Sequence, residues 1–295
     1  MKKESMPTQR DFTVKSLELK LPIMNLIGEW GAQKILEYIG KSQLKEVLWL
    51  RNRKVLERDY YEKNVVEQLI FFPNREDTEH LERELKELLK QMQKEKIPIV
   101  LKEKEQILPI KIGKNTQIFL EIVIDKYCVP FFLELMPYKK LLAYPKKEIG
   151  IDIFSSKKEL CYCQFPLEEY LAEGYYRILD RLELINDMSW YKEIYDVLRQ
   201  ESLEGRKVRD SFLRWIEEHP IPSMEDRIET LKGYRQYAYM KKKWKNESKR
   251  YADEFPKWEE VLDVMIVFIE PIVEAVTKDE IFFGDWMPQL GRYLS

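Results

Sequence analysis

The spacing of apolar residues changes near residue 166. Before this point most apolar runs are short, alternate with polar residues and end at turn-forming residues, as in strands. After it, apolar residues recur every three or four positions over long stretches, which predicts helices. The pattern therefore predicts an α+β chain, with a mixed sheet and helices in residues 1–165 and an all-helical domain in residues 166–295.

The first half is expected to contain both kinds of element. Helices are predicted at residues 23–40, 43–61 and 79–94, the last with Thr78 as its N-cap. Asn115 supplies a turn between two of the runs, which favours a hairpin. The predicted strands are residues 12–20, 65–72, 97–102, 108–112, 117–124, 128–135, 150–154 and 160–165.

The second half has helical spacing throughout. Because the proline pair Pro220 and Pro222 interrupts this spacing, a helix is expected to end there. Strands should be confined to residues before about 166, and two or more of them within residues 167–276 would contradict the two-part organisation. The predicted helices are residues 167–183, 190–198, 207–218, 224–251 and 258–276.

Composition narrows the class of protein. The 295 residues include 50 Lys and Arg against 52 Asp and Glu, so the net charge of -2 excludes a uniformly basic nucleic-acid coat but leaves room for a local basic patch. Three cysteines do not suit a disulfide framework, and two histidines cannot build a three-histidine zinc site. No apolar run resembles a signal peptide or a membrane span. A cytoplasmic protein with no membrane partner is expected.

A local basic patch lies within residues 237–251. Lys241, Lys245 and Lys249 follow i, i+4 spacing and share one face of a predicted helix, with Lys242 beside them. Lysines bind phosphates, and aromatic side chains such as Trp244 can stack on bases, so these residues are candidates for RNA binding. The alternative is a solvated helix face whose aromatic residues pack in the core.

Acidic residues at strand ends are candidates for a metal site. Asp125 follows the apolar run 122–124, Glu121 precedes it, and Asp152 lies between two isoleucines. Metal-dependent nucleotidyl transfer needs two or three carboxylates on adjacent strands. Exposure at a sheet edge is the alternative explanation. Glycine-rich phosphate-binding loops of the G-x-x-x-x-G-K-S/T and G-x-G-x-x-G types are absent.

Three short segments carry a family resemblance. Residues 165–173 read FPLEEYLAE, residues 178–181 read ILDR and residues 195–198 read YDVL. In this order, after an α/β half, they resemble the C-terminal signature of the AbiEii/AbiGii-type nucleotidyltransferase toxins. The resemblance implies a nucleotidyltransferase-like sheet domain and a role in a toxin–antitoxin or phage-defence system.

The resemblance also implies site residues and partners. Asp196 matches the last acidic residue of the signature, Asp125 falls near the strand carboxylate of the family, and Glu67 occupies the position of the metal-binding strand. These residues would be catalytic, with Asp125 and Glu67 as metal ligands. The implied cofactors are Mg²⁺ and a nucleoside triphosphate, the implied acceptor is RNA or protein, and the implied partner is a cognate antitoxin protein.

The chain departs from the family pattern at several positions. Gly174 stands where the family has a lysine, Trp190 and Tyr191 replace an Arg-Asp pair, and no Asp-x-Asp occurs upstream. Nucleotidyl transfer needs that pair of carboxylates to place Mg²⁺ on the triphosphate. A non-catalytic interaction or RNA-binding protein on the same fold therefore remains the alternative hypothesis.

Overall fold

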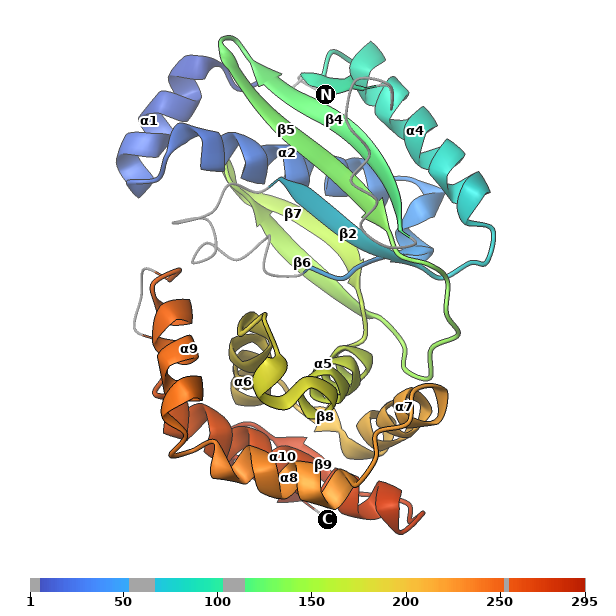
Figure 1. Ribbon diagram of the computed structural model, residues 1–295. Helices are drawn as coiled ribbons and strands as arrows, with labels where there is room; N and C mark the ends of the chain where they lie inside the picture. Colours follow the sequence, from blue (N-terminus) through green and yellow to red (C-terminus); the bar gives the residue numbers. More distant parts are fainter. Residues whose placement is uncertain (1–5, 53–66, 103–114, 252–254, 295) are drawn as a thin grey trace. The chain divides into compact units, whose positions relative to one another are not determined.

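The computed structural model describes residues 6–52, 67–102, 115–251 and 255–294. The chain divides into two compact units (Figure 1). The sheet unit comprises Met1–Lys140 and Pro145–Phe165, and the helical unit comprises the loop Leu141–Tyr144 and Pro166–Ser295. The chain therefore passes between the units three times, at both ends of this loop and at Pro166.

The sheet unit contains a seven-stranded mixed sheet with the strand order β3-β4-β5-β2-β1-β7-β6. β2 runs parallel to β5 and β1 runs parallel to β7, whereas the other neighbours are antiparallel. β4 and β5 form the long green hairpin in Figure 1. The strands are β1 (Leu48–Leu50), β2 (Gln68–Pro73), β3 (Ile99–Leu101), β4 (Thr116–Ile124), β5 (Tyr127–Leu135), β6 (Lys146–Asp152) and β7 (Ser155–Gln164).

Helices α2 (Ile23–Gly40) and α4 (Thr78–Lys94) pack against the sheet and against each other. α2 is apolar and buried over most of its length, while α4 buries one face, as its spacing predicts. A Cβ at Gly31 would lie 2.0 Å from Cδ1 of Ile122 on β4. The absence of a side chain at Gly31 therefore lets α2 approach the strand closely.

Three predictions for the sheet unit were wrong. Residues 12–20 form most of helix α1 (Gln9–Leu19), because Thr8 and Asp11 make a capping box that starts a helix where the alternation was imperfect. Residues 43–50 form the 3₁₀ turn η1 (Gln43–Glu46) and β1 instead of a helix. The predicted strand at residues 108–112 and most of the rest of the 43–61 helix lie outside the described residues. The side chain that caps α4 belongs to Asp77, not Thr78.

The helical unit is mostly helical, and the all-helical prediction was wrong on one point. The two-residue strand β8 (Leu203–Glu204) pairs with β9 (Asp285–Met287), which pairs with β10 (Arg292–Leu294). Trp286 on β9 is fully buried, and its indole Nε1 donates to the Leu198 carbonyl at 2.7 Å. The helices are α5 (Leu167–Arg181), η4 (Leu182–Leu184), α6 (Ser189–Gln200), α7 (Gly205–Glu218), α8 (Met224–Gly233), α9 (Ala238–Ser248) and α10 (Trp258–Thr277).

α10 supplies much of the core of the helical unit. Its apolar side chains pack with those of α5, α6 and α8, and the buried Tyr175 hydroxyl donates to the Met265 carbonyl at 3.0 Å. The Tyr175 ring stacks on Phe268 with 5.7 Å between ring centroids. Within the described part of the chain, no helix combines the length and the apolar character that crossing a membrane requires.

A buried carboxylate attaches the loop Leu141–Tyr144 to α5 and α7. Glu169 on α5 is only 2% exposed. Its Oε1 accepts the backbone N–H groups of Leu142 (2.7 Å) and Ala143 (3.4 Å), and its Oε2 accepts from the Arg214 guanidinium on α7. A buried carboxylate without hydrogen-bond partners is energetically costly. Loss of the loop amides would leave Glu169 with fewer partners, so the loop is held in place.

The neighbouring Glu168 is the basis of a pH prediction. Burial raises the pKa of this carboxyl above its ordinary value of 4.5, against the weaker lowering effect of its backbone hydrogen bond and of Lys207. A raised pKa means that the folded state binds the proton more tightly, so the contribution of Glu168 to stability falls as pH rises from 4.5 through the raised pKa. Glu168→Gln should remove this fall.

The variant should therefore become more stable than the wild type as pH rises from 4.5 to 8. Urea denaturation at a series of pH values measures the difference. Parallel pH profiles for the two proteins would contradict the assignment.

Candidate nucleic-acid interface

The predicted helix at residues 224–251 is divided into two helices, and the basic segment belongs to the second. α8 ends at Gly233, and the chain turns through residues 234–237 before α9 begins at Ala238. Tyr237 is the N-cap of α9 and makes no side-chain capping bond, so its ring is not engaged by the helix end. The break separates a tyrosine-rich turn from the lysine-rich helix.

The buried face of α9 consists of Met240, Trp244 and Glu247. Trp244 is 5% exposed, its Nε1 donates to the Pro256 carbonyl at 2.9 Å, and its ring lies 4.5 Å from that of Phe255. Trp244 therefore belongs to the core and has no free face for a base. Its assignment as a binding residue is not supported, because the same helical spacing that aligns the lysines turns Trp244 inward.

The lysines of α9 fall into two groups. Lys241 is half-buried and makes a 2.6 Å ion pair with Glu259 at the start of α10. Lys242, Lys245 and Lys249 are exposed. At 100° per residue these three lie within about 60° of one another, opposite the buried face. The outward-facing set is therefore Lys242, Lys245 and Lys249, and Lys242 takes the place that the i, i+4 argument gave to Lys241.

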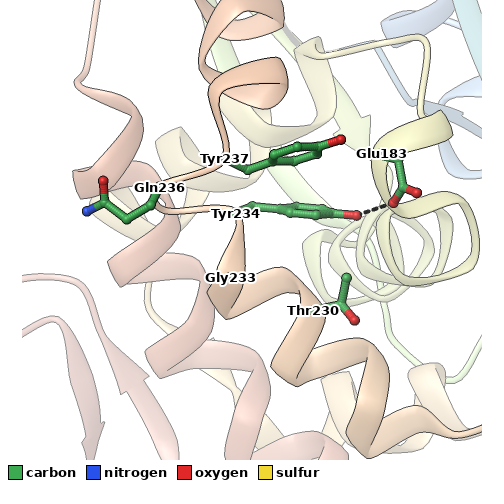
Figure 2. A pocket seen from close by; sticks show the side chains of 6 residues that line it. All are labelled: Glu183, Thr230, Gly233, Tyr234, Gln236 and Tyr237. Atoms are coloured by element: carbon green, nitrogen blue, oxygen red, sulfur yellow. Dashed lines mark hydrogen bonds between the residues drawn. The ribbon is translucent and has the colours of Figure 1, made fainter.

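Tyrosines continue this surface at the start of α9. Tyr237 and Tyr239 are 44% and 48% exposed, and their ring centroids are 6.0 Å apart. Tyr237 stacks on the buried Tyr234 at 5.7 Å, as Figure 2 shows. The Lys243 ammonium lies 5.0 Å from the centre of the Tyr239 ring and donates to the Glu183 carbonyl at 2.8 Å.

Glu183 holds the tyrosine stack at the hydroxyl end of Tyr234. Its carboxylate accepts from the Tyr234 hydroxyl (Figure 2), which lowers the pKa of Glu183, while burial and this carboxylate raise the pKa of Tyr234. The two groups therefore keep opposite roles, acceptor and donor, at neutral pH. Together with Thr230, Gly233, Gln236 and Tyr237 they line a shallow, open hollow of about 580 Å³. Tyr237 is thus held in position without being covered.

The sheet unit does not bring Glu67 and Asp125 together. Glu67 is exposed just before β2, and its carbonyl accepts from the Phe132 amide at 2.8 Å, which places it level with the second half of β5. Asp125 lies in the β4–β5 turn with a positive φ, and its carboxylate accepts from the Gln9 amide at 3.1 Å. At about 3.3 Å per residue, the five steps from Tyr127 to Phe132 separate the two by roughly 16 Å, so they cannot share a metal ion.

Asp196 forms an ion pair within its own helix, which gives this residue a structural role. It lies on α6, and its Oδ1 is 2.5 Å from Nζ of Lys192, one turn earlier. The Lys192 ammonium also lies 5.6 Å from the centre of the Tyr251 ring. The ion pair positions this cation against the aromatic ring.

The carboxylates do not fit a Mg²⁺ site. In residues 6–52, 67–102, 115–251 and 255–294, no three His, Cys, Asp or Glu side chains are grouped so that they could hold a metal ion. Glu121, another strand-end candidate, is occupied by an ion pair with Lys102 at 2.8 Å that lowers its pKa.

The fold and this surface define an α+β protein with a mixed sheet, followed by a mostly helical unit that carries an exposed basic helix. No family model matches the chain, and no curated protein matches it. Among solved structures, JHP933 from Helicobacter pylori is similar over 88% of this chain and 96% of that chain, with 14% sequence identity and a TM-score of 0.47. Similarity this low carries no argument about activity.

Proposed function

We propose that this protein is a non-catalytic RNA-binding protein whose helical unit contacts single-stranded RNA through α9. The observation that carries the proposal is the exposed set Lys242, Lys245 and Lys249 on the face of α9 opposite its buried residues. Within the described part of the chain, Lys242 and Lys245 have no ion-pair partner. Their charges are therefore available to an anionic ligand.

The dimensions of the lysine face suit a nucleic-acid backbone. Lys242 and Lys249 are seven residues apart, which is about 10 Å along a helix. A stacked nucleic-acid strand carries a phosphate about every 3.4 Å, so three lysines span the length of about three phosphates. The concentration of cations here, in a chain of net charge -2, favours a local contact over general attraction.

The tyrosines add a second kind of contact. Exposed rings beside a basic face stack on bases without regard to sequence, and each stack contributes about 1–3 kcal/mol. Tyr237 and Tyr239 would take the base-stacking role that the sequence had suggested for Trp244. Glu183, through Tyr234, keeps the Tyr237 ring ordered before a ligand arrives, which reduces the entropy lost on binding.

The finer implications of the family resemblance remain predictions. They comprise transfer of a nucleotide from a triphosphate with Mg²⁺, a toxin–antitoxin or phage-defence setting, and a cognate antitoxin protein. Binding of RNA by α9 depends on none of them.

Salt dependence tests the proposal. Fluorescence anisotropy with a labelled single-stranded RNA of twelve nucleotides measures the affinity. A plot of log affinity against log salt concentration should have a slope of about −2, because three phosphate contacts each contribute about −0.7. Affinity should fall by roughly 20-fold between 50 and 200 mM salt. A flat salt response, or no binding at 50 mM salt, would reject the proposed function.

A further inference from the structure

A second hollow in the helical unit is formed by α5, α6 and α7. It measures about 570 Å³ and lies among the second half of α5, the loop 185–187, the start of α6 and the end of α7. This volume is within the range of small-molecule sites. It is more enclosed than the hollow beside Tyr237, and four of its lining groups are aromatic rings, from α5, α6, α7 and the residue that follows α7.

One wall of this hollow is a cluster of stacked rings. Tyr176 and Trp215 stack with 5.2 Å between their centroids and 22° between their planes. The His219 ring lies 6.0 Å from each of them. None of the three is fully buried, and the His219 ring is tilted by 45° and 38° to the other two, so the cluster offers partly exposed ring surface against which a planar ligand can pack.

Two guanidinium groups stand beside this wall. Arg177 uses Nε and Nη2 to bond Glu173, and its guanidinium lies 5.6 Å from the centre of the Trp190 ring. Arg181 has a side chain that is 67% exposed, and its Nε pairs with Asp180 at 3.1 Å. Since each guanidinium has five N–H donors, both retain donors for a phosphate group.

The hollow also contains hydrogen-bond acceptors. Oδ1 of Asp187 accepts from the Ser189 amide at 3.0 Å, which leaves the other oxygen for hydroxyl or amino groups. Asn186, the preceding residue, also lines the hollow. Because Asp180 and Asp187 are acidic, the site discriminates against a ligand that is anionic throughout and favours one with a single anionic end.

We infer that this hollow binds a nucleotide: the base lies on the Tyr176–Trp215–His219 wall, the phosphate is bound by Arg181 with Arg177, and the ribose hydroxyls face Asp187. The ligand is either a free nucleoside monophosphate or one nucleotide of an RNA strand. An RNA strand could reach this hollow from the tyrosines of α9. A third hollow connects the two, because it shares Asp180 and Arg181 with this one and Glu183 and Thr230 with the hollow beside Tyr237.

Calorimetry with AMP, adenosine and the twelve-nucleotide RNA tests the inference and separates the two sources. If the ligand is a free nucleotide, AMP should bind the wild-type protein. Arg181→Gln should then lower the affinity for AMP at least roughly tenfold, since a charge-assisted hydrogen bond contributes about 1.5–3 kcal/mol, and should leave the affinity for adenosine unchanged. Trp215→Leu should weaken both. If the ligand is one nucleotide of an RNA strand, AMP alone should not bind, and the same variants should lower the affinity for the RNA.

The matched control is Arg199→Gln, which removes an exposed arginine of α6 outside the hollow and should leave all three ligands unaffected. Arg181 is exposed, so its variant remains informative if Trp215→Leu does not fold. The inference is overturned if AMP binding survives both changes, or if AMP does not bind and the RNA affinity is unchanged. RNA binding that depends on the α9 lysines but not on Arg181 or Trp215 would overturn this inference alone and leave the proposed function intact.

Discussion

Reversal of Lys242, Lys245 and Lys249 to glutamate is expected to lower the affinity for single-stranded RNA by at least roughly 100-fold at 0.1 M salt. Each change removes one phosphate contact and adds one repulsive charge on the same face of α9. The salt dependence that remains should be flat. Because all three side chains are exposed, circular dichroism and the melting temperature should change little.

Two controls isolate the position of the charges from their number. Reversal of Lys90, Lys94 and Lys96, exposed on and just after α4 of the sheet unit, gives the same net charge and should leave RNA affinity within about threefold. Lys241→Gln tests the original i, i+4 assignment, and its 2.6 Å pair with Glu259 predicts a small effect. Equal losses in both triple variants would mean that only general attraction is present.

Arg214→Ala should be the most destabilising of the substitutions considered. It leaves the Glu169 carboxylate buried without its cationic partner, and breaking such a pair typically costs about 3–5 kcal/mol. Urea denaturation followed by tryptophan fluorescence measures the loss. The amides of Leu142 and Ala143, which donate to Glu169, should also exchange with solvent faster, as hydrogen exchange would show.

Two further variants provide losses of stability with which that of Arg214→Ala can be compared. Arg206→Ala removes an arginine from the same helix, 63% exposed and 3.9 Å from Asp210, and should cost no more than about 0.5 kcal/mol. The double change Arg214→Met with Glu169→Gln should recover part of the loss, because it removes both charges. A cost for Arg214→Ala no greater than that for Arg206→Ala would show that the buried pair contributes little.

Periodicity predicted the α+β class and most of the elements. α2 was predicted to the residue, and α5, α6, α7 and α10 to within a few residues, because each buries an apolar stripe at helical spacing. β4 and β5 were predicted to within one residue from short apolar runs. Segment 12–20 was missed because a capping box, which depends on two polar residues, decided its conformation.

The candidate site was less accessible from the sequence. Spacing placed Lys245 and Lys249 on one face, but only the fold shows that Glu259 pairs with Lys241 and that the core covers Trp244. Glu183 lies 51 residues from Tyr234, and no local pattern joins two residues at that separation. The carboxylates Glu67 and Asp125 were grouped by analogy, and the strand register, which the sequence does not specify, keeps them apart.

The pairing of β8 with β9 has a consequence for synthesis of the protein. Leu203 lies opposite Trp286, and the Trp286 indole completes the core between Phe268 and the end of α6. The core of the helical unit therefore cannot close until residues 285–287 have emerged from the ribosome. Domains that are complete earlier can fold while translation continues, so the helical unit should acquire its native packing later than a unit whose core needs no such distant segment.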